Sequence, residues 1–174
     1  MTTVLFPGTF DPIHYGHINI AKRAAELFDQ VIVAVYAREQ DNILFPPQER
    51  LALVEESFRD TNNISVTAYT GLTVKFAKKV GAQSIVRGLR VFSDFEYEFR
   101  MALANNRLDP DIDVIALITS EKHTFLSSTT VREIAALGGD VSSMVPKHVE
   151  LALKKRFHLL GDDQDVVPLT SLRD

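Results

Sequence analysis

Short runs of apolar residues alternate along this chain with longer segments in which apolar residues recur every three or four positions. The short runs predict five β-strands, at residues 3–6, 31–35, 64–67, 84–86 and 114–118. The longer segments predict four α-helices between them, at residues 18–28, 47–58, 73–80 and 92–108. Because strands that alternate with helices are typical of βαβ units, the pattern predicts a five-stranded parallel sheet with four crossover helices.

The composition of the strands indicates that the sheet is covered on both faces. The second strand, Val31-Ile32-Val33-Ala34-Val35, is apolar at every position, whereas a strand with one solvated face would alternate apolar and polar residues. We therefore expect an α/β protein with a doubly wound parallel sheet and helices on both sides.

Two further helices are predicted after the fifth strand. The first spans residues 130–137 and ends at Gly138 and Gly139, and the second spans residues 147–157 and begins after Pro146. Residues 159–174 are polar, contain Pro168 and show no periodicity, which is typical of a mobile tail. Since 174 residues is the usual size of one domain, we expect a single domain over residues 1–157 and a tail over residues 158–174.

Composition and charge narrow the choice of ligand and location. The net charge of −4 argues against general electrostatic binding to nucleic acid or to an anionic membrane, so an anionic ligand must be held by a local site. The sequence has no cysteine, no recognisable signal peptide and no run of about 20 apolar residues that could span a membrane. We therefore expect a cytoplasmic protein without disulfides, zinc–thiolate sites or iron–sulfur clusters.

The loop after the first strand has the residues of a phosphate site, at the strand ends where open parallel sheets bind ligands. The segment from Phe6 to His17 contains two glycines, two prolines and two histidines. Glycine lets the backbone approach a phosphate, and the following helix adds unpaired N–H groups and the positive end of its dipole. His17 is placed to donate a hydrogen bond to a phosphoryl oxygen; capping of the helix or packing under the sheet is the alternative. The segment lacks P-loop spacing, and no Gly-rich dinucleotide fingerprint occurs.

Two arginines flank a glycine after the fourth strand. Arg87-Gly88-Leu89-Arg90 is followed by Asp94-Phe95-Glu96-Tyr97-Glu98 at the start of a helix. Because guanidinium groups bind phosphate bidentately, this pair suits two separate phosphate groups; solvated surface arginines are the alternative.

Hydroxyl residues open the helix after the fifth strand, in Leu126-Ser127-Ser128-Thr129-Thr130-Val131-Arg132. Serine and threonine at a helix start cap the backbone, which is worth about 1 kcal/mol. The same hydroxyl and N–H groups can bind phosphates, so capping and ligand binding are compatible here.

These segments resemble the nucleotidyltransferase superfamily with the H/T-x-G-H signature, here His14-Tyr15-Gly16-His17. The hydroxyl block matches a motif of the same superfamily, with Leu126 for the usual isoleucine. The arginine block with its acidic continuation resembles the bacterial phosphopantetheine adenylyltransferase family, and the resemblance extends over residues 3–157. The resemblance implies a Rossmann-like fold and transfer of the adenylyl group of ATP to 4′-phosphopantetheine, giving dephospho-coenzyme A and pyrophosphate. It also implies a homohexamer built from two trimers. Since no aspartates have metal-cage spacing, Mg²⁺ is expected to arrive with ATP.

The resemblance also implies roles for individual residues. Catalytic contacts belong to Thr9, His17 and Arg90. The ATP site consists of residues from three segments, namely Thr9, Phe10, His14, His17, Gly88, Leu89, Arg90, Glu98, His123, Thr124, Phe125, Leu126, Ser127, Ser128 and Thr129. The phosphopantetheine site consists of Thr9, Thr73, Arg87 and Asn105, although an N-cap of its own helix is the alternative for Thr73. Arg38 and Asp41 are added to this site because of a departure from the family pattern. No protein metal ligand is implied.

One loop departs from the family pattern. The family has a phosphate-binding lysine four residues before Phe45, and this chain has Asp41 there. An acid at that position opposes the acceptor phosphate at a cost of about 1 kcal/mol or more. We expect Arg38, just past the second strand, to compensate by binding that phosphate together with Arg87.

Two other functions remain open on the sequence. A sister nucleotidyltransferase that uses cytidine triphosphate or another acceptor would carry a similar four-residue signature. A non-enzymatic nucleotide-binding module would keep the fold and lose the acceptor site, for which Asp41 is the only support. Asp11 is expected to order its loop rather than to bind a metal ion.

Overall fold

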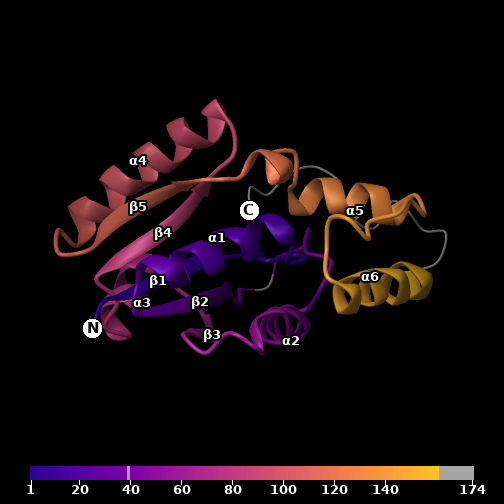
Figure 1. The fold of residues 1–174 in the computed structure, drawn as a ribbon, viewed down its shortest axis with the longest axis horizontal. Coiled ribbons are helices and arrows are strands. Elements are labelled where there is room, and N and C mark those ends of the chain that lie inside the picture. Colours follow the sequence, from indigo (N-terminus) through magenta and orange to yellow (C-terminus); the bar gives the residue numbers. More distant parts are fainter. Residues whose placement is uncertain (39, 161–174) are drawn as a thin grey trace.

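A parallel five-stranded sheet forms the centre of the protein (Figure 1). The computed structural model describes residues 1–38 and 40–160. The strands are β1 (Thr3–Gly8), β2 (Gln30–Tyr36), β3 (Ile64–Tyr69), β4 (Ser84–Leu89) and β5 (Asp113–Ile118). Their order is β3-β2-β1-β4-β5, and all neighbours are parallel. The predicted α/β class and the doubly wound sheet are therefore confirmed.

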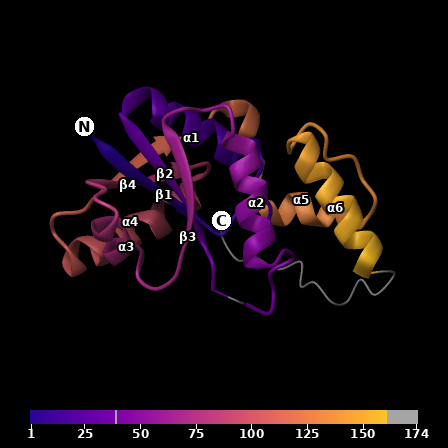
Figure 2. The same ribbon diagram turned by 90° about the horizontal axis from the view of Figure 1, so that it is seen from below.

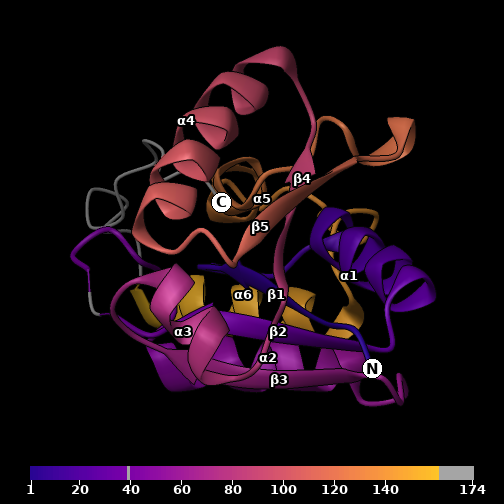
Figure 3. The same cartoon turned by 90° about the vertical axis from the view of Figure 1, so that its left-hand side faces the viewer.

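Helices cover both faces of the sheet, and the predicted ones all form. They are α1 (Tyr15–Leu27), α2 (Pro47–Phe58), α3 (Thr73–Lys79), α4 (Phe92–Leu108), α5 (Ser128–Ala136) and α6 (Lys147–Leu160), with a short 3-10 turn at Glu121–His123. α1 lies on the opposite side of the sheet from α3 and α4 (Figure 3), and α6 packs against α2 and α5 (Figure 2).

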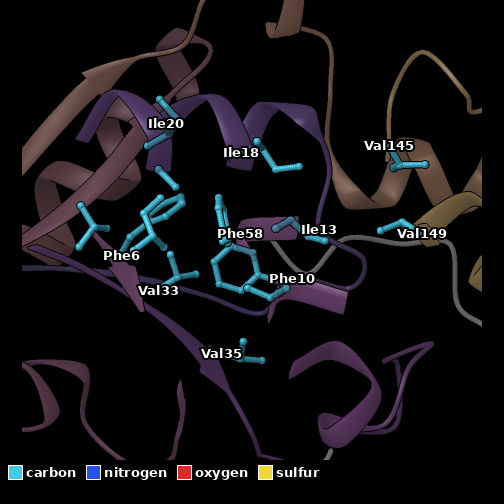
Figure 4. Close-up of a cluster of buried hydrophobic side chains, with 14 of the residues drawn as sticks. Phe6, Phe10, Ile13, Ile18, Ile20, Val33, Val35, Phe58, Val145 and Val149 are labelled. Atoms are coloured by element: carbon cyan, nitrogen blue, oxygen red, sulfur yellow. The ribbon is translucent and has the colours of Figure 1, made fainter. Parts of the chain in front are cut away.

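Alternating strand residues divide the core into two clusters, because successive side chains of a strand point to opposite faces. Val4 and Phe6 of β1 join a cluster that includes residues of α1, α2 and α6, part of which is drawn in Figure 4. Leu5 faces the other way and packs with Val74 and Ala77 of α3. The central strands β1 and β2 are thus covered on both sides, as their composition predicted, whereas β5 at the edge of the sheet has no buried residue.

Several element ends differ from the predictions. α1 begins at Tyr15 rather than at residue 18, because a side chain in the preceding loop caps it. β1 and β4 run two and three residues further than predicted, so Gly8 and Leu89 belong to strands. α6 continues to Leu160, and the rest of the predicted tail lies outside the described residues. No helix within residues 1–38 and 40–160 is long and apolar enough to cross a membrane.

Helix α4 stands apart from the others because none of its residues is buried. It packs on β4 and β5, but several of its apolar side chains are exposed outside that contact. Phe92 is 86% exposed, and the rings of Phe92, Phe95 and Phe99 follow one another along the helix at centroid separations of 6.3 and 5.8 Å.

Candidate active site

A cleft opens at the carboxyl ends of β1 and β4, where the strand order reverses. The space between its lining residues is about 620 Å³ when it is counted out to the open solvent. Six residues that the sequence singled out line it together: His14, His17, Arg87, Gly88, Arg90 and Glu98. Its remaining lining residues are Phe6, Pro7, Gly8, Gly16, Ile20, Asp94, Tyr97 and Thr119.

His14 caps the helix that enters the cleft. Its Nδ1 accepts hydrogen bonds from the backbone N–H groups of Gly16 (3.1 Å) and His17 (3.4 Å), and its ring is buried. The N–H of Tyr15 donates to the carbonyl of Met144 at 2.9 Å. The expectation that unpaired N–H groups at this helix start would hold a phosphate is therefore wrong. The cap and the Met144 carbonyl already use these donors, so an anion here depends on the helix dipole and on side chains.

The ring of His17 is fixed in position and in tautomer. Its Nδ1 accepts the backbone N–H of His14 at 3.2 Å, so in the neutral ring the proton must be on Nε2. The two imidazoles stack with centroids 3.7 Å apart, and the ring of Phe10 meets His17 edge to face at 4.9 Å. The structure shows the capping role of His17, which completes the capping box through Nδ1, and donation from Nε2 to a phosphoryl oxygen stays a prediction.

Gly16 leaves the space that the His14 ring occupies. A Cβ added at Gly16 would lie 2.8 Å from Cε1 of that ring and 2.9 Å from Nδ1, closer than real contacts allow. We expect Gly16→Ala to displace the cap and lower the free energy of unfolding by about 1–2 kcal/mol. The midpoint of thermal unfolding would then fall by roughly 2–8 °C, as measured by calorimetry. Lys22→Ala, an exposed change in the same helix, is the control, and an unchanged midpoint for Gly16→Ala would contradict the tight contact.

A second cavity adjoins the cleft. Three residues predicted to bind the phosphopantetheine acceptor line it together: Thr73, Arg87 and Asn105. Its other lining residues are Pro7, Ile85, Tyr97, Glu98, Met101, Ala102 and Val114. Thr73 begins α3, whose N-cap is Leu72, so the alternative N-cap role for Thr73 is not what the structure has. Its hydroxyl instead lies 2.9 Å from the hydroxyl of Tyr69, which fixes its direction.

Arg87 and Glu98 form the wall shared by the cleft and the second cavity. Nε and Nη2 of Arg87 donate to the two carboxylate oxygens of Glu98 at 2.9 and 2.8 Å, and Nη1 donates to the carbonyl of Pro7 at 2.8 Å. Burial works to lower the pKa of Arg87, but the hydrogen bond and charge of Glu98 outweigh it and raise that pKa. The ion pair thus keeps a fixed positive group between two sites that were assigned to different substrates.

Arg90 joins the cleft to the loop after β5. Its Nη1 donates to the carbonyl of Leu126 at 2.6 Å, and its Nε donates to Asp94 at 3.2 Å. Both contacts come from elements that follow Arg90 in the chain, so the guanidinium is a bridge rather than a solvated surface group.

The segment from residue 123 to 129 lies beside the cleft, and none of its side chains is among the described residues that line it. Leu126 and Ser128 are buried, and the Ser128 hydroxyl donates to the carbonyl of Pro12 at 2.7 Å. Ser127 is the N-cap of α5, with its Oγ accepting the N–H of Thr130 at 3.0 Å. The capping role is thus present for Ser127. Burial, with the charge of Lys122, lowers the pKa of His123 and favours its neutral form at pH 7.

Thr9 and Phe10 follow β1 but do not line the cleft among the described residues. The ring of Phe10 is buried in the core (Figure 4), so only its backbone could meet a ligand. Its φ of 51° is in the left-handed region, which turns the chain sharply. Leu89 likewise has no side chain in the cleft lining.

Two buried arginines that the sequence analysis missed hold these loops. The guanidinium of Arg50 donates to the carbonyls of Phe45 (3.0 Å), Thr9 (2.7 Å) and Tyr36 (2.7 Å). Arg132 donates to the carbonyl of Asp11 at 2.6 Å. The sequence did contain a signal for Arg50. This residue shares one face of α2 with Val54 and Phe58, so it lies in an apolar stripe.

Asp11 orders its loop, as the sequence indicated. Its carboxylate accepts the N–H groups of Leu44 (2.7 Å) and Phe45 (2.9 Å), which joins the loops after β1 and β2. Burial raises the pKa of Asp11, while those N–H groups and the charge of Arg132 oppose the rise. Within residues 1–38 and 40–160, no group of three or more His, Asp or Glu side chains is placed to hold a metal ion.

Arg38 and Asp41 are not brought together with Arg87. They line a separate hollow with Arg50 and Arg156, and neither side chain lines the cleft or the second cavity. The expected sharing of one phosphate by Arg38 and Arg87 would need a different position of the loop after β2.

Comparisons with known proteins find relatives in the family that the sequence resembles. Residues 5–134 match the family model described as cytidylyltransferase-like. A phosphopantetheine adenylyltransferase of Roseiflexus sp. is 49% identical over 157 residues, covering 90% of this chain and 98% of the relative. One of Desulfitobacterium hafniense is 44% identical over 163 residues, covering 94% and 100%. The solved structure of a putative nicotinate-nucleotide adenylyltransferase from Vibrio parahaemolyticus superposes with a TM-score of 0.65 at 20% identity, covering 88% of this chain and 99% of that one, and shows the same fold.

Proposed function

This chain belongs to the cytidylyltransferase-like family and, within it, to the phosphopantetheine adenylyltransferases, and we infer that it transfers the adenylyl group of ATP to 4′-phosphopantetheine. The products are dephospho-coenzyme A and pyrophosphate, a step of coenzyme A biosynthesis. One observation carries the proposal: relatives named for this activity are 44–49% identical over at least 90% of this chain and nearly all of their own length.

The reaction requires the two substrates to be aligned and does not require a general base from the protein. An oxygen of the acceptor phosphate attacks the α-phosphorus of ATP, the bond from that phosphorus to the bridging oxygen breaks, and pyrophosphate leaves. The nucleophile is ionised near neutral pH, so no proton has to be removed from it. Catalysis then consists of holding both substrates in line and stabilising the charge on the transferred group.

The cleft supplies the groups for the donor nucleotide. His17 Nε2–H and the guanidinium of Arg90 stabilise charge on the α-phosphate of the transferred adenylyl group, and Gly88 lets the backbone come close to it. A Cβ at Gly88 would lie 3.1 Å from Ile20, so a larger residue at this position would crowd the lining of the cleft. Thr9 acts from the turn after β1, where its carbonyl is anchored by Arg50. Mg²⁺ enters bound to ATP as part of the substrate.

The second cavity takes the acceptor. Arg87 binds its phosphate at the shared wall, and Thr73 and Asn105 contact the pantetheine arm. This assignment is supported by the fact that all three residues line one cavity that meets the donor cleft at Arg87 and Glu98. The two substrates then approach each other across the ion pair.

Turnover of purified protein tests the proposal. With MgATP and 4′-phosphopantetheine, pyrophosphate release should match the formation of dephospho-coenzyme A. Replacing ATP with CTP, or the acceptor with nicotinate mononucleotide, should reduce the rate to the background of an enzyme-free control. A faster reaction with either replacement would favour the sister nucleotidyltransferase, and no pyrophosphate with any pair would favour the non-enzymatic module.

The exposed face of α4 suits contacts between copies of the chain. Phe92, Phe95, Phe99 and Leu103 are each at least 50% exposed on one helix, an apolar surface that is unusual for a monomer. A homohexamer, built from two trimers as the sequence resemblance implies, would cover it. We propose the cytoplasm as the location, since a chain without cysteine fits a reducing compartment.

Sedimentation equilibrium measures the assembly directly. The wild-type protein at micromolar concentration should have the mass of a hexamer, and Phe95→Glu with Phe99→Glu should shift it towards smaller species, because buried charges at an interface are costly. Leu27→Glu, at an exposed position of α1, is the matched control and should keep the wild-type mass. A monomeric wild-type protein would refute this part of the proposal.

A further inference from the structure

Three arginines from separate elements meet in a hollow that the proposed reaction does not use. Arg38 follows β2, Arg50 belongs to α2 and Arg156 belongs to α6; they line the hollow with Gln40, Asp41, Ile43, Phe45, Pro46 and Pro47. We call it the arginine hollow. Among the described residues it shares none of its lining with the cleft or with the second cavity.

Arg50 is the fully buried member of the hollow. Its Nε and Nη1 donate to three backbone carbonyls, but its Nη2 is buried and has no hydrogen-bond partner among the described residues. A buried donor without an acceptor destabilises the folded chain, and more so when the donor is charged. An acceptor that enters the hollow would remove this cost.

The other charges of the hollow favour an anion as that acceptor. Arg156 uses its Nε to donate to the carbonyl of Leu44 at 2.9 Å, and the structure gives its guanidinium no other hydrogen bond among the described residues. Arg38 is exposed at the same hollow. The described lining residues of the hollow thus include three arginines and one acidic residue, Asp41, and the charge of Asp11 also acts on Arg50 from outside that lining.

We propose that the arginine hollow is a second anion site, which binds a phosphate group between Arg50, Arg38 and Arg156. A guanidinium group can donate two hydrogen bonds to one phosphate. Three guanidinium groups around one hollow can therefore share the several oxygens of a single phosphate. Because Arg50 also donates to the carbonyl of Thr9, the bound phosphate steadies the turn that leads to His14 and His17. The site does not depend on the proposed reaction.

Calorimetric titration with inorganic phosphate at constant ionic strength tests the site. Arg156→Gln should raise the dissociation constant by about 10-fold or more, since it removes a charged hydrogen-bond partner. Arg59→Gln has the same change of charge at an exposed position of the chain outside the hollow and should stay within about twofold of wild type. Arg38→Gln is the second variant, because Arg38 is exposed, and it should weaken phosphate binding in the same direction.

A second arm separates this site from the acceptor site. In protein saturated with 4′-phosphopantetheine, inorganic phosphate should still bind to wild type and still be weakened by Arg156→Gln. Loss of all phosphate binding in that arm would overturn the proposal of a second site, because inorganic phosphate would then bind only where the acceptor phosphate binds. Equal binding by wild type and by both the Arg156→Gln and Arg38→Gln variants, or no binding to wild type, would overturn the proposal. Phosphate should also slow amide hydrogen exchange over residues 9–17, and binding without that change would overturn the coupling to Thr9.

Discussion

Replacing His17 with alanine should lower kcat by about 10²- to 10³-fold and leave KM for ATP within about threefold of the wild-type value. The Nε2–H of His17 donates to the α-phosphate of the transferred adenylyl group. This donor is effective because the ring is held in position before the substrates bind. The backbone N–H of His14 sets its tautomer, the stacked His14 ring and the edge of Phe10 set its plane, and no reorganisation is needed during the reaction. Steady-state kinetics measure both constants.

His17→Gln separates this role from capping. Glutamine at the third position of a helix completes a capping box, so the Gln variant should regain the thermal stability that the Ala variant loses. It should remain as slow as the Ala variant, because the amide does not reach where Nε2 lies. If His17→Ala turns over within a few-fold of wild type, His17 only caps α1 and the catalytic assignment is wrong.

Replacing Arg87 with alanine should raise KM for 4′-phosphopantetheine by about 100-fold and change KM for ATP much less. Two causes add. The acceptor phosphate loses its guanidinium, and Glu98 loses the partner that holds both of its carboxylate oxygens at the shared wall. An unpaired carboxylate beside the acceptor phosphate then repels it.

Two further variants make that prediction sharper. Arg87→Ala combined with Glu98→Gln should recover part of the acceptor affinity, because the repelling carboxylate is gone. Arg38→Ala is the matched arginine control, and it should raise KM for the acceptor much less than Arg87→Ala does, since Arg38 lines another hollow. An increase as large as that of Arg87→Ala would restore the hypothesis that Arg38 replaces the family's lysine.

The fold could be predicted because its signals are local and repeated. Each strand is a short apolar run and each helix has its own period, so the alternation predicts the parallel sheet without knowledge of any long-range contact. The strand ends then locate the cleft, and the residues after β1 and β4 meet there as the sheet topology requires. Element ends were less accurate. The start of α1, for example, is decided by the His14 ring and not by the apolar pattern.

The sequence did not predict the direction in which several loop side chains point. Phe10 is next to Thr9 in the chain, yet its positive φ turns the ring into the core, which no spacing rule reveals. Arg38 and Asp41 lie close to the site in sequence but face another hollow. Arg50 was overlooked because arginines are normally exposed, and only its place in an apolar stripe with Val54 indicates burial.

A crystal structure of the protein with dephospho-coenzyme A tests the central claim most directly, because the product spans both substrate sites. The account predicts the adenylate half in the cleft, with the diphosphate between His17 Nε2 and Arg87, and the pantetheine arm in the second cavity against Thr73 and Asn105. A product whose pantetheine arm lies along Arg38 and Arg156, or whose diphosphate makes no contact with His17, would contradict it.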